Sequence, residues 1–361
     1  MKKRFNIGII GATGMVGQRF IALLNDHPWF HIAVLAASGR SAGKTYGECV
    51  EGRWAMETPI PKAIAEMTVM DASAISQIAP MVDFVFCAIS ASKAETRALE
   101  ERYAKAEIPV ISNNSACRMV ADVPMLIPEI NPEHATIIHK QRERLGTKKG
   151  FIAVKPNCSI QSYVPILTPL LPYGIEEIAV CTYQAISGAG KTFNTMPEIL
   201  DNIIPFIGGE EEKSEQEPLK VWGKLNDAKD AVIPLTTPTI SAQCLRVPVS
   251  DGHTAAVSVR FTNKPTKEEI VALLKNWETL PQILALPSAP TPFITVFEED
   301  NRPQAKLDRD IEKGMGVCVG RLREDTIFDY KFVGLSHNTL RGAAGGGVLM
   351  AELLCAQGYM D

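Results

Sequence analysis

Short apolar runs that alternate with helical segments dominate the first part of the chain. Five of these runs have the length of a buried strand, at residues 5–10, 31–37, 82–89, 108–111 and 150–154. Between them, residues 16–24 and 93–106 have the character of helices. Because strands that alternate with helices form parallel sheets, the pattern predicts a doubly wound α/β domain with its ligands at the carboxyl ends of the strands.

Strand-like segments recur in the second part of the chain, where fewer helices separate them. They lie at residues 178–183, 241–249, 254–261, 295–297, 316–322 and 329–333. Helices are expected at 163–171, at 267–277, where Thr266 and Glu269 form a capping box, and at 339–357. We therefore expect an α+β domain with a mixed sheet in this part of the chain.

The composition is that of an ordinary globular protein and excludes several classes of function. The 361 residues suffice for two domains, and a net charge of −4 gives no reason to expect nucleic acid or a membrane as a partner. Glycines interrupt the apolar N-terminal run, so we expect no targeting segment. The eight cysteines are scattered without a C-x-x-C pair, which argues against a disulfide framework or a metal site and favours a reducing, cytoplasmic location.

A glycine-rich turn joins the first predicted strand to the first predicted helix. It reads Gly11-Ala12-Thr13-Gly14-Met15-Val16-Gly17, a G-x-x-G-x-x-G spacing. Backbone N–H groups in such a turn hold the pyrophosphate of a dinucleotide. The strand before it and the helix after it favour this interpretation over a tight turn in some other α/β protein.

The end of the second predicted strand favours NADP over NAD. An NAD site places an Asp or Glu there, whereas this chain continues as Ser38-Gly39-Arg40-Ser41-Ala42-Gly43-Lys44. Hydroxyl groups, Arg and Lys pair well with a 2′-phosphate, and a solvated basic loop is the alternative. By the same topology, Ser90 is expected to face the cofactor. Residues 113–118 should face the active site, where Arg118 is either an anion ligand or a surface arginine.

One cysteine occupies the position expected of a catalytic nucleophile. The sequence Lys155-Pro156-Asn157-Cys158-Ser159-Ile160-Gln161-Ser162 follows the apolar run 150–154 and precedes the predicted helix at 163–171. The positive end of a helix favours the thiolate, and nearby backbone N–H groups can hold an oxyanion, as a dehydrogenase that forms a thioester requires. The alternative is a cysteine that packs as a small hydrophobe.

Three further segments bear on the chemistry. The loop Gln184-Ala185-Ile186-Ser187-Gly188-Ala189-Gly190-Lys191 lacks the spacing of a nucleotide triphosphate site, and we interpret it as backbone that approaches a ligand closely. Residues 209–217 are acidic, which is typical of a solvated face. Arg246 suits a substrate carboxylate, and His253 suits acid and base catalysis near neutral pH. A structural turn histidine is the alternative, because only proximity to Cys158 makes a catalytic pair.

Four motifs, in order along the chain, resemble those of aspartate-β-semialdehyde dehydrogenases. They are Gly11-Ala12-Thr13-Gly14-x-Val16-Gly17, Asn157-Cys158-Ser159, Gln184-Ala185-Ile186-Ser187-Gly188-Ala189-Gly190 and Arg246-Val247-Pro248-x-x-x-Gly252-His253-Thr254. The loop 38–44 and the segment Ser336-His337-Asn338-Thr339-x-Arg341-Gly342-Ala343-Ala344 are similar to the branch found in archaea and fungi. The resemblance covers essentially the whole chain.

The resemblance implies a fold, a cofactor and a reaction. It implies a Rossmann-type NADP-binding domain at 1–157 and 338–361, and a catalytic and dimerisation domain at 158–337. The expected reaction is the reductive dephosphorylation of L-aspartyl-4-phosphate to L-aspartate-4-semialdehyde, in lysine, threonine and methionine biosynthesis. A homodimer or homotetramer is expected, with a small-molecule substrate and phosphate as its ligands.

The resemblance also implies roles for individual residues. Cys158 would be the thioester nucleophile, His253 the acid and base, and Gln184 the group that orients the substrate or intermediate. Substrate would be bound by Arg246 at its α-carboxylate, by Glu217 near its amino group, and by Asn157, Arg118 and Lys220 at its phosphate. The residues in contact with the cofactor would be Gly11, Thr13, Gly14, Met15, Val16, Ser38, Arg40, Ser41, Ser187, Gly188 and Asn338.

The chain departs from the family pattern at two places, and other functions remain open. Pro156 stands where related sequences often carry Ser or Gly, and the match around Lys220 is loose. A malonyl-CoA reductase or another acyl-thioester reductase would use the same Cys and His but would need room for a pantetheine arm. N-acetylglutamyl-phosphate reductase is a further relative, which the Gln184 and Arg246 motifs disfavour. A non-catalytic NADP-binding sensor would have had no reason to retain the catalytic side chains.

Overall fold

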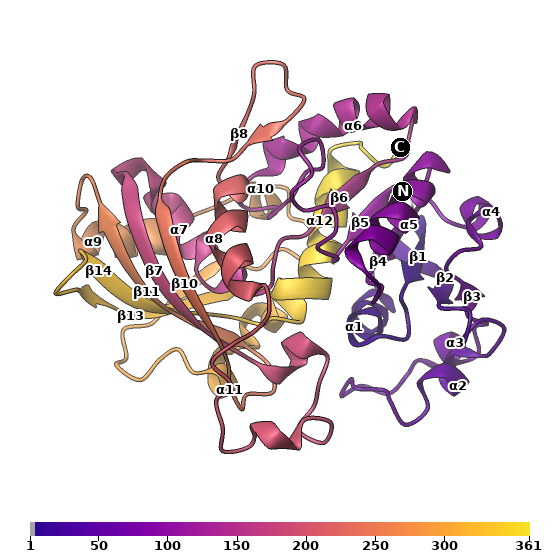
Figure 1. Ribbon diagram of the computed structural model, residues 1–361, viewed down its shortest axis with the longest axis horizontal. Coiled ribbons are helices and arrows are strands. Elements are labelled where there is room, and N and C mark those ends of the chain that lie inside the picture. Colours follow the sequence, from indigo (N-terminus) through magenta and orange to yellow (C-terminus); the bar gives the residue numbers. More distant parts are fainter. Residues whose placement is uncertain (1–3) are drawn as a thin grey trace.

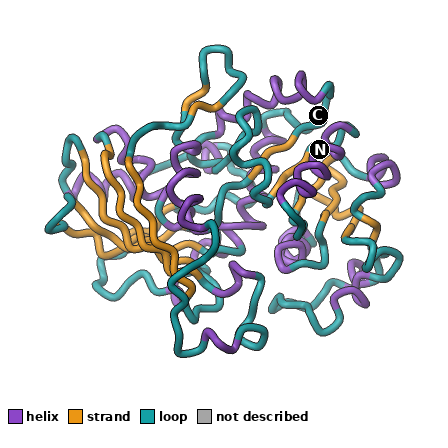
Figure 2. Tube along the Cα trace, viewed as in Figure 1, coloured by secondary structure: helices purple, strands orange, loops and turns teal. Residues whose placement is uncertain are grey.

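The computed structural model describes residues 4–361 and is built on two separate sheets (Figure 1). Residues 1–3, at the start of the segment for which no targeting role is expected, lie outside the described residues. Among residues 4–361, no helix has the length and apolar character needed to cross a membrane. The strands gather in two groups with helices between them, as Figure 2 shows by colour.

The first sheet has six parallel strands in the order β3-β2-β1-β4-β5-β6. The strands are β1 (Phe5–Ile10), β2 (Phe30–Ala37), β3 (Met70–Asp71), β4 (Phe84–Cys87), β5 (Val110–Ser112) and β6 (Ile152–Val154). Side chains of α1 (Met15–Leu24) and α12 (Gly345–Ala356) pack on one face, and those of α5 (Lys93–Lys105) pack on the other. Shorter helices complete this part: α2 (Tyr46–Val50), α3 (Lys62–Ala65), α4 (Ile75–Ile78) and α6 (Ile138–Leu145). Because both faces are covered, β4 is buried at all four positions.

The second sheet is mixed, with the order β10-β7-β11-β14-β13-β12. Its strands are β7 (Ile175–Gln184), β10 (Thr239–Arg246), β11 (His253–Phe261), β12 (Ile294–Val296), β13 (Val317–Glu324) and β14 (Tyr330–Ser336). One face packs on α7 (Val164–Leu167) and α9 (Lys267–Asn276), whereas the alternate positions of β11 are only half-buried. The remaining elements are α8 (Glu210–Val221), α10 (Leu280–Ile283), α11 (Ala305–Asp308) and the hairpin of β8 (Lys224–Leu225) and β9 (Val232–Ile233).

The predicted combination of a doubly wound parallel sheet and a mixed sheet is confirmed, but three segments differ from the prediction. The helix expected at 163–171 is two short pieces, α7 and a 3-10 helix at Thr168–Tyr173, because prolines occupy the first turns of both pieces. The helix expected at 339–357 begins as a π-helical turn, Leu340–Ala344, before α12. The acidic segment expected on a solvated face forms α8, whose inner face is buried.

Candidate active site

The first glycine-rich turn has the shape of a pyrophosphate cradle. Gly11 adopts a φ of +91°, and a Cβ there would lie 2.3 Å from the carbonyl oxygen of Ala88. A Cβ on Gly17 would lie 2.3 Å from the carbonyl oxygen of Gly11, so the helix can approach the strand only without a side chain. Gly14 caps α1 without a side-chain hydrogen bond, and no acidic residue stands in the first turn. Gly11, Ala12 and Gly14 donate their N–H groups to backbone carbonyls, so the N–H groups at the start of α1 are the ones that fit a dinucleotide pyrophosphate.

The end of β2 presents the basic loop that was predicted to bind a 2′-phosphate. Ser38 and Arg40 are exposed, and Ser41 closes a turn by donating its N–H to the carbonyl of Ser38 at 2.9 Å. Among residues 4–361, neither Arg40 nor Lys44 forms an ion pair, so both charges are available to an anion. Ser90 is also exposed, in the loop that follows β4.

Cys158 and His253 come together although 95 residues separate them. Cys158 lies in the turn after β6 and His253 begins β11, with 3.5 Å between Sγ and Nε2. Ala185 donates its backbone N–H to Nδ1 at 3.0 Å, so the hydrogen of the neutral ring resides on Nε2 and faces the sulfur. Burial, with a smaller contribution from Arg246, lowers the pKa of His253 to about 3. In this geometry the ring is a neutral hydrogen-bond donor toward Sγ, and the acid and base role of His253 stays a prediction.

The surroundings of Cys158 do not favour its thiolate in the way the sequence predicted. Burial and then Glu210 raise the pKa of the Cys158 thiol to about 11, against the effects of Lys155, Arg118 and Arg246. The element that follows Cys158 is a 3-10 turn of four residues, Ser159–Ser162, and not the N-terminus of a long helix. The groups here that favour a thiolate are therefore the cations Lys155, Arg118 and Arg246, and not a helix dipole.

Glu210 forms the polar centre of the site, and the sequence analysis did not identify it. The first turn of α8 brings its carboxylate within 3.0 Å of Asn157 Nδ2, 3.2 Å of Gln184 Nε2 and 2.7 Å of Lys213 Nζ. Although burial alone would raise it, Lys213 and the two amides hold the pKa of Glu210 below its usual value. Glu210 is therefore a carboxylate at neutral pH, ready to accept from a substrate ammonium.

Arg118 and Glu217 are brought together, but as partners of each other. Arg118 Nη1 lies 2.9 Å from Glu217 Oε1, and Arg118 Nε donates to the carbonyl of Lys155 at 2.9 Å. The second carboxylate oxygen of Glu217 accepts from the N–H of Asn157 at 2.5 Å. Glu217 thus fixes the turn beside Cys158.

The structure does not bring Lys220 to the active-site pocket. Its ammonium donates to the carbonyls of Arg118, Val120 and Val123 at 2.6, 2.7 and 3.1 Å, which occupies all three of its N–H groups. Lys213, one turn into the same helix, lines the pocket and remains half-exposed.

A pocket of about 260 Å³ lies at the junction of the two sheets. It is lined by Val16, Asn113, Ser115, Arg118, Asn157, Cys158, Ser187, Gly188, Glu210, Lys213, Asn338, Thr339, Gly342 and Ala343. Both the amide nitrogen and the amide oxygen of Asn113 lack a hydrogen-bond partner. A second pocket of about 390 Å³ shares Ser115, Arg118 and Lys213 with the first. An orphaned amide and two shared cations suit a polar, anionic ligand.

Three predicted residues form or support the pocket wall. Arg246 is buried and donates from Nη1 to the carbonyl of Ala185 at 2.7 Å. A Cβ on Gly188 would lie 3.0 Å from that Nη1 and 3.1 Å from the His253 ring, so only glycine allows this loop to cover both side chains. Asn338 joins two segments, since it accepts from the N–H of Gly252 at 2.8 Å and donates to Ser187 Oγ at 2.9 Å.

The π-helical turn before α12 meets Cys158 at a glycine to which the sequence analysis assigned no role. A Cβ on Gly342 would lie 2.8 Å from the Cβ of Cys158. Gly342 belongs to the π-helical turn, whose buried Arg341 pairs with the carboxylate of Glu129 and donates from Nε to Gln161 Oε1. The motif 336–344 contained this signal, but only the three-dimensional contact explains it.

Comparisons with known proteins find relatives along nearly the whole chain. Two family models match, the NAD-binding domain of semialdehyde dehydrogenases at residues 6–138 and their dimerisation domain at 167–341. The aspartate-semialdehyde dehydrogenase of Archaeoglobus fulgidus is 44% identical over 97% of this chain and 98% of its own. That of Saccharomyces cerevisiae is 43% identical over 97% of each chain. A crystal structure of the Candida albicans enzyme with NADP has a TM-score of 0.88 and 38% identity, and covers 99% of this chain and 100% of that one.

Proposed function

The chain belongs to the aspartate-semialdehyde dehydrogenase family, and we propose that it reduces L-aspartyl-4-phosphate to L-aspartate-4-semialdehyde with NADPH through a thioester on Cys158. The observation that supports this most directly is the contact between Cys158 Sγ and His253 Nε2, 3.5 Å, beside a pocket that holds Glu210, Lys213 and Arg118. Such a pocket matches a substrate with an ammonium group and a phosphate. The enzyme would serve lysine, threonine and methionine biosynthesis.

The covalent chemistry needs no net proton transfer to Cys158. The thiolate attacks the acyl carbon, a C–S bond forms, and the C–O bond to phosphate breaks with release of inorganic phosphate. NADPH supplies the hydride that reduces the thioester. His253 Nε2–H then faces both the oxyanion that develops on the carbon and the sulfur that leaves as a thiolate, so one donor stabilises both.

Different residues around the pocket are proposed to bind the different charged groups of the substrate. We assign the α-ammonium to Glu210, the α-carboxylate to Arg246, and the phosphate to Arg118, Lys213 and Asn157. Gln184 holds Glu210 in place through its hydrogen bond of 3.2 Å. These assignments move the predicted ammonium and phosphate roles of Glu217 and Lys220 to Glu210 and Lys213.

The cofactor assignment rests on the cradle and the basic loop. NADP would lie across Gly11 to Val16, with its 2′-phosphate on Ser38, Arg40 and Ser41. Its nicotinamide end would reach Ser187, Gly188 and Asn338, and Ser90 would flank it. Because α12 packs on the parallel sheet, we place residues 338–361 with residues 1–157 in the cofactor domain and residues 158–337 in the catalytic domain.

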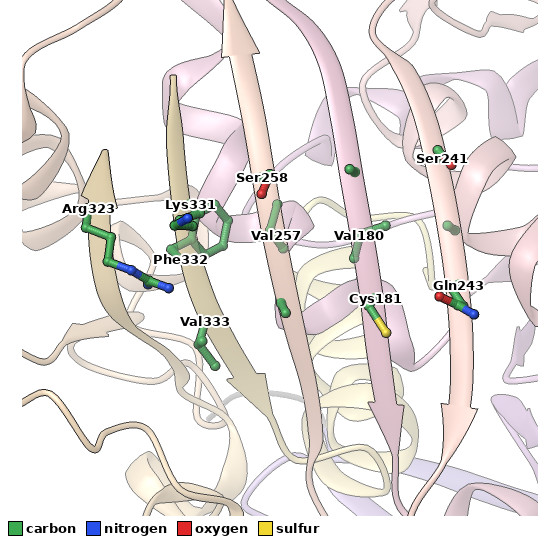
Figure 3. Close-up of a pocket in the computed structure, with 13 residues that line it drawn as sticks. Val180, Cys181, Ser241, Gln243, Val257, Ser258, Arg323, Lys331, Phe332 and Val333 are labelled. Carbon is green, nitrogen blue, oxygen red and sulfur yellow. The ribbon is translucent and has the colours of Figure 1, made fainter. Parts of the chain in front are cut away.

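The open face of the mixed sheet suits a homodimer. Residues from five neighbouring strands, most of them half-buried or exposed, form a shallow hollow of about 380 Å³ there, and Figure 3 shows Cys181, Ser241, Gln243, Ser258 and Lys331 along it. The dimerisation-domain model covers all of these strands. A second copy of the chain is the occupant we propose. All eight cysteines are free, which supports a reducing, cytoplasmic location.

The test is NADP⁺ reduction with L-aspartate-4-semialdehyde and phosphate, beside NADPH oxidation by malonyl-CoA. We expect turnover with the semialdehyde only when phosphate is present. Turnover only with the CoA thioester would show that the proposed substrate is wrong, without affecting the fold or the proposals for the cofactor and the nucleophile. Absence of both reactions in a protein that binds NADPH would favour the alternative of a non-catalytic NADP-binding sensor.

A further inference from the structure

The loop after β5 carries three of the residues that line the active-site pocket. They are Asn113, Ser115 and Arg118. The carbonyl of Asn113 accepts from Arg118 Nη2 at 3.2 Å, so the position of this loop helps to set the position of the guanidinium. In the proposed function, Arg118 binds the phosphate of the substrate. The contacts that fix this loop therefore bear directly on the binding of phosphate.

Glu100 on α5 anchors this loop from the other face of the parallel sheet. Its side chain is fully buried, and Oε1 accepts from Ser112 Oγ at 2.5 Å and from Asn114 Nδ2 at 3.0 Å. The Oγ of Ser112 in turn accepts the backbone N–H of Asn114 at 3.0 Å, which closes the cluster. Both neighbours of Asn113 are thus tied to a single carboxyl oxygen.

The anchoring of Ser112 and Asn114 also sets the direction of the residue between them. Successive side chains of an extended chain point to opposite faces, and the N–H of Asn113 continues the strand pairing by donating to the carbonyl of Cys87 at 2.9 Å. Asn113 accordingly points toward α12, where a Cβ on Gly347 would lie 3.3 Å from its Oδ1. Its buried amide has no partner among the described residues, which leaves it available to a ligand in the pocket.

A buried carboxyl group is a costly way to fill this place beneath the sheet. Burial raises the pKa of Glu100, and the hydrogen bonds from Ser112 and Asn114 act against this rise. The second oxygen, Oε2, has no hydrogen-bond partner within residues 4–361. The other titratable groups that face the carboxyl are the thiols of Cys87 and Cys117, and neither is a cation. An acid in such surroundings calls for a role that an apolar side chain could not perform.

We propose that Glu100 is a positioning residue that holds the loop after β5 in place, and through it the Arg118 guanidinium that binds phosphate. The inference rests on the proposed role of Arg118. Glu100 does not line the pocket and acts through Ser112 and Asn114. A second path runs through the backbone, since the carbonyl of Ser112 accepts from the N–H of Lys155 and the carbonyl of Lys155 accepts from Arg118 Nε, both at 2.9 Å.

Loss of the anchor should weaken the binding of phosphate more than it slows the chemical step. Glu100→Leu leaves Ser112 and Asn114 without their shared acceptor. Arg118 keeps its other two partners and stays in the site, but the carbonyl of Asn113 no longer holds Nη2 in a fixed place. An interaction that is equally strong in the ground state and the transition state affects KM and not kcat. We therefore expect KM for phosphate to rise about tenfold, as for the loss of one charge-assisted hydrogen bond, and kcat to change less than about twofold.

The test is steady-state reduction of NADP⁺ with L-aspartate-4-semialdehyde at varied phosphate, in the wild type and in Glu100→Leu. Glu100→Gln is the conservative variant, because its amide oxygen still accepts from both side chains, and KM for phosphate should return to within about twofold of the wild type. Tyr103→Phe is the matched control on α5. It removes another buried hydrogen bond, 2.7 Å from Oη to the carbonyl of Ala72, and should leave KM for phosphate unchanged. Thermal unfolding of each variant separates a loss of stability from a loss of phosphate binding.

A folded Glu100→Leu enzyme with the wild-type KM for phosphate would overturn the proposal. An equal rise in Tyr103→Phe, or a Glu100→Gln enzyme as impaired as Glu100→Leu, would do the same. Should Glu100→Leu fail to fold, Ser112→Ala and Asn114→Ala each remove one of the two hydrogen bonds. A wild-type KM in both of these variants would then decide against Glu100.

Hydrogen exchange gives a second reading that needs neither substrate nor turnover. In Glu100→Leu, the backbone amides of residues 112–118 should exchange faster than in the wild type, whereas Tyr103→Phe should leave them unchanged. Wild-type exchange of this loop in Glu100→Leu would count against the anchor. Absence of phosphate-dependent turnover in the wild type would refute the proposed function instead, and exchange would still test Glu100.

Discussion

Replacing Gly342 with alanine should disable the nucleophile without unfolding the protein. The added Cβ would lie 2.8 Å from Cys158 Cβ and 3.3 Å from Cys158 Cα. Carbon atoms are comfortable at about 3.5–4.0 Å, so either Cys158 or the π-helical turn has to move by roughly 0.7 Å or more. Because a displacement of about 1 Å at a reacting group costs about 100-fold, we expect kcat to fall by that factor.

The stability of this variant should change far less than its activity. Overpacking costs about 1–3 kcal/mol, and alanine regains up to about 1 kcal/mol over glycine in a helical backbone. Steady-state kinetics beside thermal unfolding separates the two effects. The matched control is Gly345→Ala on the same segment, where the new Cβ would meet the flexible end of Met315 at 2.5 Å and not the nucleophile. A folded Gly342→Ala enzyme with the wild-type kcat would refute the reasoning.

Three further predictions concern the cofactor, the phosphate and pH. Arg40→Ala should raise KM for NADPH about tenfold and leave KM for NADH unchanged, because the proposed partner of Arg40 is the 2′-phosphate, which NADH lacks. Equal effects on the two KM values would show that the loop does not bind the 2′-phosphate. Lys213→Met should raise KM for phosphate about tenfold. Lys220→Met should instead lower the free energy of unfolding by about 1–3 kcal/mol, because the three carbonyls that accept from Lys220 lose their donor. Kinetics and urea titrations that gave the reverse pattern would contradict the placement of both lysines. Burial lowers the pKa of His253 to about 3 and that of His337 to about 4, so the unfolded chain binds protons more readily than the folded one. Stability should therefore be full above about pH 6.5 and fall as pH drops toward those folded values, by about 2 kcal/mol per histidine at about pH 5; equal urea midpoints at pH 7 and 5 would be inconsistent with this.

The fold and the nucleophile could be inferred from local patterns. The glycine spacing after the strand at 5–10 leaves little alternative to a tight turn into a helix, and the apolar runs have strand length. The turn that carries Cys158 could also be recognised from the sequence as a candidate site, because ligands of a parallel sheet bind at the carboxyl ends of its strands. The role of His253 needed the structure, since pairing of β11 with β7 is what brings the ring to the loop at Ala185.

The acidic helix was misread for a physical reason. Residues 210–220 contain the spacing E-x-x-K twice, as Glu210 with Lys213 and as Glu217 with Lys220. The two copies lie two helical turns apart and share a face, so sequence could not say which one meets the pocket. The structure places the first at the pocket and turns the second toward Arg118 and the backbone carbonyls. Hydrophobicity gives little warning here, because four of the six buried positions of this helix are charged or polar.

The central claim is that a thioester forms on Cys158, and it can be observed before reduction occurs. The enzyme is mixed with L-aspartyl-4-phosphate without NADPH, quenched in acid, digested and examined by mass spectrometry. We expect the peptide that contains Cys158 to gain one aspartyl group as phosphate is released, and Cys158→Ala to show neither change. Steady reduction of substrate in the presence of NADPH, with the Cys158 peptide unmodified at every quench time, would contradict the account.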